Sequence, residues 1–372
     1  MSNKIRFRNK NYASFYSTLK LNVDKHFSDK NGSKHADSRM ILKTGLILSA
    51  FVTLYFTILF ADLSLGSKFG LVLVMGFVTA LIGFNVCHDA IHGSYSYNST
   101  INKSLGLIFN VIGANAFVWH ITHNIAHHTY TNIKGADEDI EIAPGLVRVN
   151  EKDEIKSFHK YQHIYTFILY GFASIAWVFK KDYKFFFQKS IGGFDNSRKT
   201  PGETFKLFFF KIFYYTFFII VPFIVLDLPW WQFLAGFIGM HLIEGWTLAL
   251  VFPLAHVVDN TDFPEPDENG DIHEAWAAHQ MRTTANFATG SPLATWLTGG
   301  LNMQIEHHLF PNICHIHYPA ISSIVRTTAE EFGLPYHENK TFWDALKAHY
   351  NHLKKFGWDE HIARKRLQES QI

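Results

Sequence analysis

Four long apolar stretches alternate with polar segments along the chain. They cover residues 41–61, 69–87, 205–226 and 232–254. Each is long enough to cross the roughly 30 Å hydrocarbon core of a bilayer, which takes about 20 helical residues. Residues 62–68 and 227–230 form the short connections, and Pro229 and Trp230 suit a membrane interface. The pattern therefore predicts four transmembrane helices arranged as two hairpins.

Two further apolar stretches, residues 105–119 and 163–179, are short or interrupted by small and polar residues. We interpret both as interfacial or re-entrant helices that lie against the bilayer. If either one crossed the membrane, the histidine clusters described below would fall on opposite faces. This interpretation assumes that the clusters share one site.

Basic residues indicate the orientation of the spans. Lysine and arginine are concentrated in residues 4–43, in residues 134–206 and after Arg326, whereas the two short connections carry only Lys68. The positive-inside rule then places both termini and the long central loop in the cytosol. We expect an all-α integral membrane protein whose four transmembrane helices carry a helical cytosolic cap.

The predicted spans also divide the chain. We expect a polar, basic, cytosolic segment over residues 1–40, which has no secretory signal pattern. A membrane domain follows over residues 41–336, and a cytosolic helical tail over residues 337–372. Residues 257–274 form a proline- and acid-rich loop.

Composition points to a metal. Of 372 residues only 18% are charged, below the roughly 25% of soluble domains. The net charge of +2 gives no reason to expect a nucleic-acid partner. Two cysteines, Cys87 and Cys314, cannot form a disulfide framework, which favours a reducing cytosolic setting. The unusual number is 22 histidines, and histidine is the commonest metal ligand.

Three histidine clusters follow apolar stretches, and a lone histidine follows the fourth span. Pairs spaced i, i+4 lie on one helix face and can bind one ion together. Eight imidazoles exceed the four ligands of a structural zinc but fit two ions with open positions. Imidazole suits zinc, copper, iron and nickel, so the residues alone leave the metal open. The eight candidate ligands are His88, His92, His123, His127, His128, His256, His307 and His308.

The three clusters resemble the histidine boxes of the membrane fatty acid desaturases. The runs HDAIHGSYS, HNIAHHTYTN and QIEHHLFP occur in the family's order and at its span positions, and the resemblance covers residues 41–336. Gln304, which opens the third box, is similar to the front-end and linoleoyl-CoA-desaturase-like branch. Gln304 stands where desaturases of the stearoyl-CoA type have a histidine. The resemblance therefore does not decide whether Gln304 is itself an iron ligand.

The resemblance implies a fatty acyl desaturase. Two iron ions and O₂ would insert a cis double bond into an acyl-CoA or acyl-lipid chain with two external electrons. Residues 1–40 are too short for a fused cytochrome b5 domain, so the resemblance implies a separate donor, ferredoxin or free cytochrome b5. We expect a multi-pass protein of the bacterial inner membrane. The alternative is a di-iron hydroxylase or ketolase acting on a lipid or carotenoid chain.

Residues next to the boxes are candidates for orienting the imidazoles through their second nitrogen. Helix caps or solvated loop acids explain most of them equally well, and residues 137–141 could cap a helix or form a lid. His241 and Glu244, spaced i, i+3 inside the fourth span, are candidates for lining a substrate tunnel. The candidates near the boxes, Gln304 included, are Asp89, His120, Asn124, Asn132, Asp137, Asp139, Gln304 and Glu306.

The remaining polar residues receive structural interpretations. His279, His315 and His317 are expected to cap helices or meet lipid headgroups. Arg148, Lys152 and Arg282 are expected to form a solvated positive face rather than a phosphate site, and Cys87 to be a small packing residue.

Overall fold

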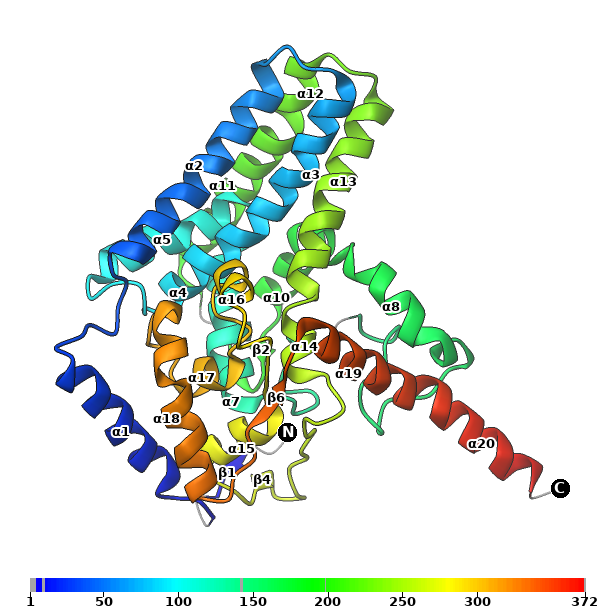
Figure 1. Ribbon diagram of the computed structural model, residues 1–372. Helices are drawn as coiled ribbons and strands as arrows, with labels where there is room; N and C mark the ends of the chain where they lie inside the picture. The colour runs from blue at the N-terminus through cyan, green and yellow to red at the C-terminus, as the bar shows by residue number, and fades with distance from the viewer. Residues whose placement is uncertain (1–4, 9–10, 141–142, 198, 371–372) are drawn as a thin grey trace.

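The structure is a computed structural model that describes residues 5–8, 11–140, 143–197 and 199–370. It is mostly helical, and a tall bundle stands on a broader, irregular cap (Figure 1). The prediction of four spans is confirmed, because four helices are long and apolar enough to cross a membrane. They contain α2 (Ser38–Phe60), α3 (Leu65–Ile82), α11 (Pro201–Tyr215) continued by η5 (Thr216–Ile220) and α12 (Val221–Leu226), and α13 (Trp230–Ala249).

Side-chain caps define where three of these helices begin. The Asp37 carboxylate accepts hydrogen bonds from the backbone N–H groups of Arg39 and Met40. These groups lie in the first turn of α2 and have no partner within the helix. Ser64 caps α3 in the same way. Thr200 caps α11, and Pro201 follows at the first helical position, where its fixed φ suits a helix. The starts of these three helices are therefore encoded locally.

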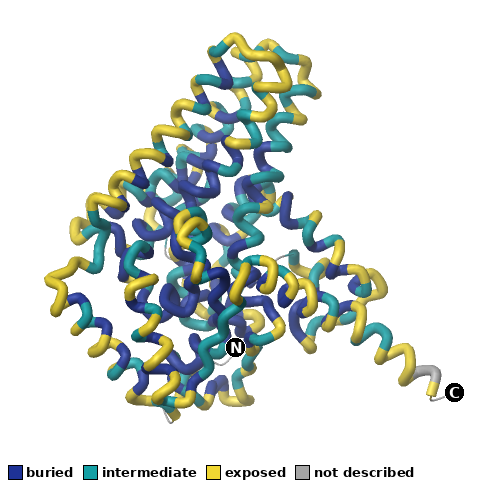
Figure 2. The backbone as a smooth tube through the Cα atoms, viewed as in Figure 1, coloured by how far each residue is buried: buried dark blue, intermediate teal, exposed yellow. Residues whose placement is uncertain are grey.

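The outer faces of the bundle are apolar. Figure 2 shows exposed positions along the outside of the tall helices and buried positions towards the cap. Large side chains such as Leu42, Phe56, Phe205 and Ile224 are more than half exposed. Only 17% of the α11–α12 span window is buried, against 61% for α3, so α3 is the central helix. Such outward-facing apolar surface is what a lipid environment requires.

A close contact joins α3 to α13. A Cβ atom at Gly76 would lie 2.2 Å from the carbonyl oxygen of Met240. Small residues let membrane helices approach to backbone contact, where dispersion forces replace the hydrophobic effect. Gly76 therefore holds the two central helices together.

Gly76→Leu is expected to destabilise the protein by at least about 2 kcal/mol, because the backbone carbonyl of Met240 cannot move aside for a side chain. Thermal unfolding of the purified protein in detergent would show this as a lowered Tm. Gly70→Leu on the same helix is the matched control, since a Cβ at Gly70 meets nothing within 4 Å. Equal Tm values for the two variants would contradict the assignment.

The two ambiguous apolar stretches do not form straight spans. Helix α5 (Ser99–Val111) and the segment Ala116–Tyr130 are bent by 112° at their junction, as in a broken span or re-entrant loop. The second stretch divides into α8 (Gln162–Tyr170), α9 (Ala173–Ala176) and η4 (Trp177–Lys181), followed by α10 (Asp182–Phe187). Helix α8 lies to the side of the bundle in Figure 1. Apolar residues such as Ile164 and Ile168 remain exposed on it, which suits an interfacial helix.

The cap contains short helices and three small sheets that the all-α prediction did not anticipate. Strands β1 (Arg6–Phe7) and β4 (Asp271–Ile272) are parallel, β2 (Ser190–Ile191) and β3 (Phe194–Asp195) antiparallel, and β5 (Ala285–Phe287) and β6 (His337–Asn339) parallel. The main helices are α1 (Phe15–Asp29), α15 (Trp276–Thr283), α16 (Pro292–Thr298), α18 (Tyr318–Glu331), α19 (Phe342–Lys354) and α20 (Glu360–Glu369).

Both terminal segments pack on the cap. Helix α1 buries Phe15, Leu19 and Val23 in one apolar cluster with residues of α15 and α18. On the other side, His349 of α19 lies between Tyr170 Oη, at 2.6 Å, and the backbone oxygen of Val257, also at 2.6 Å. The segments at the two ends of the sequence therefore support the elements that hold the candidate site.

Candidate metal centre

Four separate segments bring all eight predicted histidines together beneath the bundle. The first box lies on α4 (His88–Ile91), the second on η2 (His120–His127) and α7 (His128–Tyr130), and the third on α17 (Gln304–Leu309). His256 ends α14 (Phe252–His256), just after the fourth span. Since these segments meet, the boxes lie on the same side of the bundle, as the interpretation of the bent pair required.

The imidazoles form two adjoining groups. In each group the ring nitrogens lie within 4.8 Å of one another, close enough to bind one ion. His128 lies between the groups, with ring centroids 4.6 Å from His307 and 4.4 Å from His308. The first group is His88, His92, His123 and His307, and the second is His127, His256 and His308.

A π-helix presents the second box. The backbone N–H of His128 donates to the carbonyl of His123, a bond across five residues, because η2 is a π-helix. π-helical turns are rare and often occur at functional sites. The wider turn lets residues four and five apart share a face, so His127 and His128 both reach the site with His123. A second π-helix, η1 (Gly83–Cys87), directly precedes His88.

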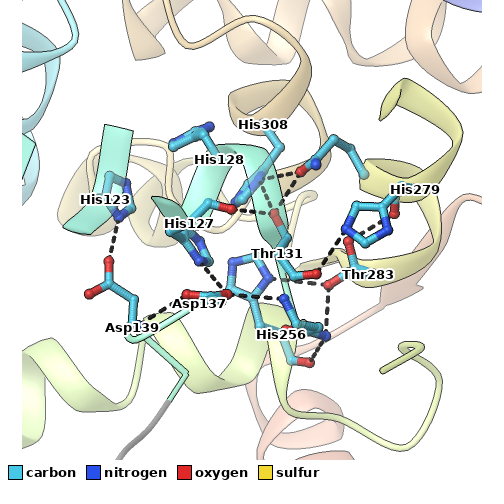
Figure 3. A network of polar contacts seen from close by, with 12 residues as sticks. His123, His127, His128, Thr131, Asp137, Asp139, His256, His279, Thr283 and His308 are labelled. Atoms are coloured by element: carbon cyan, nitrogen blue, oxygen red, sulfur yellow. Dashed lines mark hydrogen bonds and ion pairs between the residues drawn. The ribbon is translucent and has the colours of Figure 1, made fainter. Parts of the chain in front are cut away.

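Two carboxylates orient the second box (Figure 3). His123 Nδ1 donates to Asp139 Oδ2 at 2.9 Å, and His127 Nδ1 donates to Asp137 Oδ2 at 2.8 Å. Asp137 is buried and also accepts the backbone N–H groups of Asn132 and Asp139. A carboxylate on Nδ1 fixes the ring so that Nε2 is the ligand nitrogen, and makes that nitrogen more basic. Asp137 and Asp139 therefore occupy the predicted supporting positions, while Glu141 lies outside the described residues.

Three further oxygen atoms orient imidazoles, and the residues that supply them are not predictable from the sequence. His307 Nδ1 lies 3.1 Å from Tyr318 Oη, and His308 Nδ1 donates to Gln280 Oε1 at 2.8 Å. His256 Nδ1 donates to the backbone oxygen of Thr283 at 3.2 Å. No spacing in the sequence links these residues to the boxes, because α15 and α18 reach the site only through tertiary packing.

The remaining nitrogens fit a metal. Among the eight candidate ligands, all of which lie in the described chain, seven have an Nε2 that is buried without a hydrogen-bond partner: His88, His92, His123, His128, His256, His307 and His308. Buried unpaired polar atoms are costly and rare, and this many in one place require an explanation. Burial lowers the pKa of His92, His307 and His308 well below 6.5, so these rings are neutral near pH 7. Neutral, preoriented imidazoles are the ligands that a metal ion requires, so these groups could hold one.

Asp89 supports the first box indirectly. Its Oδ2 accepts from Cys314 Sγ at 3.0 Å and from His315 Nδ1 at 2.8 Å. Its Oδ1 lies 3.9 Å from His88 Nδ1, beyond hydrogen-bond distance. The Lys43 ammonium lies 3.1 Å from His315 Nε2. Asp89, Cys314 and His315 therefore satisfy one another's hydrogen bonds. The buried Lys43 ammonium beside them disfavours binding of a metal ion at this third group.

The other candidates near the boxes have different roles. Asn124 donates to the carbonyl of Ile91, and Asn132 donates to the carbonyl of His256, so both tie box segments together. Glu306 accepts from Asn286 and Tyr336 rather than from an imidazole, and burial raises its pKa. His120 is exposed. Gln304 is buried, and within the described residues its Oε1 has no hydrogen-bond partner.

Of the structural expectations, those for His315 and Arg148 are wrong. His315 is buried against Asp89, so it neither caps a helix nor meets headgroups. His279 is also buried, but its Nε2 donates at 2.9 Å to the carbonyl of Thr131, the C-cap residue of α7, which fits the expected helix cap. Arg148 is buried rather than solvated. Its guanidinium donates to backbone carbonyls and to Glu360 on α20, which compensates for the burial of its charge.

Most other expectations for polar residues fit the contacts better. Lys152 is exposed and paired with Glu265, and Arg282 is partly exposed beside Glu274. His317 does not fit its expectation, because its Nε2 donates at 2.9 Å to the carbonyl of His35, which lies in a bend outside the helices. Cys87 is fully buried in an apolar cluster, as expected of a packing residue.

The predicted tunnel residues lie in a polar group inside the bundle. His241 is buried, with Nε2 2.9 Å from Tyr214 Oη and Nδ1 2.9 Å from Ser174 Oγ. Glu244 Oε2 lies 3.4 Å from His241 Nδ1. Glu244 lines an otherwise largely apolar cavity that reaches His88, whereas His241 lies behind it.

A helical membrane bundle with a buried polyhistidine centre defines the class of protein, and sequence comparison gives the family. Residues 67–340 match the family model for fatty acid desaturases. The chain therefore belongs to the fatty acid desaturase family, and it is an oxidoreductase, a fatty acyl desaturase of the front-end type. The four spans and this family together support a membrane protein.

Characterised relatives match nearly the whole chain. An acyl-lipid (8-3)-desaturase from Physcomitrium patens is 38% identical over 93% of this chain and 72% of its own length. An sn-1 linoleoyl-lipid 6-desaturase from Arthrospira platensis is 36% identical over 92% of both proteins. A Synechocystis protein with the same name is 34% identical over 95% of this chain and 98% of its own length.

Proposed function

We propose that the chain inserts a cis double bond into the acyl chain of a membrane glycerolipid, near its carbonyl end. The observation that carries this proposal is the pair of buried histidine groups in a chain of this family. The acyl-lipid substrate is favoured over acyl-CoA by the relatives, whose names specify acyl lipids and linoleoyl lipids. Hydroxylation or ketolation is the less favoured outcome, since the relatives are named as desaturases.

The eight histidines would hold two iron ions. The first group would supply four ligands and the second group three, and His128 lies between the groups. Bound iron supplies the activation of O₂ that an unactivated C–H bond requires, beyond what side chains can do. In the overall reaction a CH₂–CH₂ unit loses two hydrogens and becomes CH=CH. O₂ takes up these hydrogens with two external electrons and two protons, and two water molecules form.

The protein's own contribution is orientation and exclusion of water. Asp137, Asp139, Gln280 and Tyr318 hold imidazole rings so that Nε2 faces the metal. The Trp119 ring stacks on His123 with a centroid distance of 4.3 Å, which shields one side of the site. An apolar cavity next to His88 would place a methylene pair beside the metals.

The cap and both termini are proposed to lie in the cytosol, because lysine and arginine are concentrated in the segments on that side of the spans. In a bacterium the membrane would be the inner membrane. A separate cytosolic protein, ferredoxin or free cytochrome b5, would then reach the cap and deliver the two electrons.

Expression in a cyanobacterial host whose glycerolipids contain linoleoyl chains tests the proposal. Mass spectrometry of dimethyloxazoline derivatives would locate the new double bond, and elemental analysis of the purified protein would give about two iron ions per chain, one for each histidine group. Pulse labelling with linoleoyl-CoA and with linoleoyl phosphatidylcholine distinguishes the two substrate classes. Lipids that gain oxygen instead of losing hydrogen, or a protein that contains zinc only, would overturn the proposal.

A further inference from the structure

Two adjoining cavities lead towards the candidate metal centre. The inner cavity reaches His88, and the outer cavity opens between η4 and the end of α13. Four residues line both cavities, namely Trp119, Trp177, Leu248 and Phe252. These side chains stand between the cavities, and their movement would join the two into one mostly apolar passage.

The two parts differ in size. The outer cavity holds about 150 Å³ and the inner cavity about 30 Å³. An acyl chain must therefore displace side chains of the inner lining as it enters. The inner lining includes Ile112, Val178 and Phe109, whose apolar side chains suit methylene groups.

A single cation lies at the outer end of the passage. Lys181 is the one lysine or arginine that lines either cavity among the described residues. Its side chain is 31% exposed and its Nζ lies 3.3 Å from Asp139 Oδ1, the carboxylate that orients His123. The ammonium also lies 5.2 Å from the centre of the Trp177 ring, which belongs to both cavities. Lys181 therefore faces the passage and remains accessible.

This arrangement fits an amphiphile whose polar end stays at Lys181 while its apolar chain passes the metals. An ammonium with three donors can bond to the carbonyl oxygen of an ester and still contact Asp139. The Asp139 carboxylate contacts both the Lys181 ammonium and the His123 ring. A carbonyl held at Lys181 would therefore place the carbons nearest to it beside the proposed metals, which suits a double bond near the carbonyl end, as in the relatives named 6-desaturases.

We propose that Lys181 binds the acyl carbonyl of the substrate and thereby fixes the position of the new double bond. This inference rests on the proposed function and adds a residue that determines specificity. Lys181 acts on regiochemistry by holding one end of the substrate, and it is not a ligand of the metal. The alternative is that Lys181 only neutralises Asp139 and so supports His123.

Three variants separate these roles in the host that makes linoleoyl lipids. Lys181→Gln removes the charge, Lys181→Arg keeps it, and Lys180→Gln is the matched control on the exposed neighbouring position. Product is measured per bound iron, which corrects for any loss of metal through Asp139. Loss of one charge-assisted hydrogen bond predicts about tenfold less product for Lys181→Gln, with double bonds at more than one position. Lys181→Arg and Lys180→Gln are expected to keep the wild-type position.

A Lys181→Gln enzyme that makes double bonds at the wild-type position only would overturn the inference, whatever its yield. If this variant makes no product, thermal stabilisation of the purified protein by linoleoyl phosphatidylcholine decides. A smaller rise in Tm than for Lys180→Gln supports carbonyl binding, and an equal rise overturns it. Failure of the wild-type enzyme to form any double bond would instead refute the proposed function.

Discussion

Replacing His308 with alanine is expected to abolish desaturation and to lower the iron content of the purified protein to one ion per chain or fewer. His308 belongs to the three-member group with His127 and His256, so the variant leaves two ligands there. Two imidazoles cannot replace a set of three or more ligands for a catalytic metal. The measurements are elemental analysis and the double-bond content of host lipids.

His120→Ala is the matched control, because His120 lies on the same π-helix as the second box but is exposed. It is expected to keep its iron and its activity. Loss of iron in both variants would show that the structure assigns the wrong imidazoles to the site. Size-exclusion chromatography of each variant establishes that the fold is retained.

Asp137→Asn is expected to weaken iron binding by about 10- to 100-fold, the usual cost of removing a group that orients a ligand. Burial lowers the pKa of His127, but the charge and hydrogen bond of Asp137, together with the charge of Asp139, raise the pKa overall. Without this carboxylate the ring becomes a weaker base and a weaker ligand. The amide also places a donor where the carboxylate accepts two backbone N–H groups. An iron-chelator competition at pH 7.5 would measure the change in affinity.

Asp259→Asn provides the comparison for Asp137→Asn, because it makes the same change on an exposed aspartate near the end of the fourth span. We expect wild-type iron affinity for this variant. If Asp137→Asn also bound iron like the wild type, the hydrogen bond to His127 would have no role in holding the metal.

The spans and the histidine boxes could be predicted because they depend on local patterns. A span requires a continuous apolar run, and helix caps such as Asp37 and Thr200 lie beside the helices they begin. The histidines within each box are close in the sequence, and spacing predicted that a pair four residues apart binds one ion. The structure confirms this for His88 and His92, whereas it places His123 and His127 in different groups, because each group combines residues from several boxes.

The groups that orient the imidazoles could be predicted only in part. Asp137 and Asp139 follow the second box closely, and adjacency was enough to suggest them. Gln280 and Tyr318 come from distant helices, and a buried histidine such as His279 looks like a surface histidine until its carbonyl partner is known. The π-helix that turns His128 towards the site also depends on tertiary packing, since periodicity alone predicts an α-helix.

The groups that orient the imidazoles have a consequence for how the enzyme is made. Ligands run from His88 to His308, and Tyr318, which holds His307, comes later still. A nascent chain that ends before α17 lacks the third box, and one that ends before α18 lacks the tyrosine that holds His307. If the histidines hold iron as proposed, iron insertion would follow synthesis of the chain as far as α18, and a chain that terminates earlier is expected not to mature.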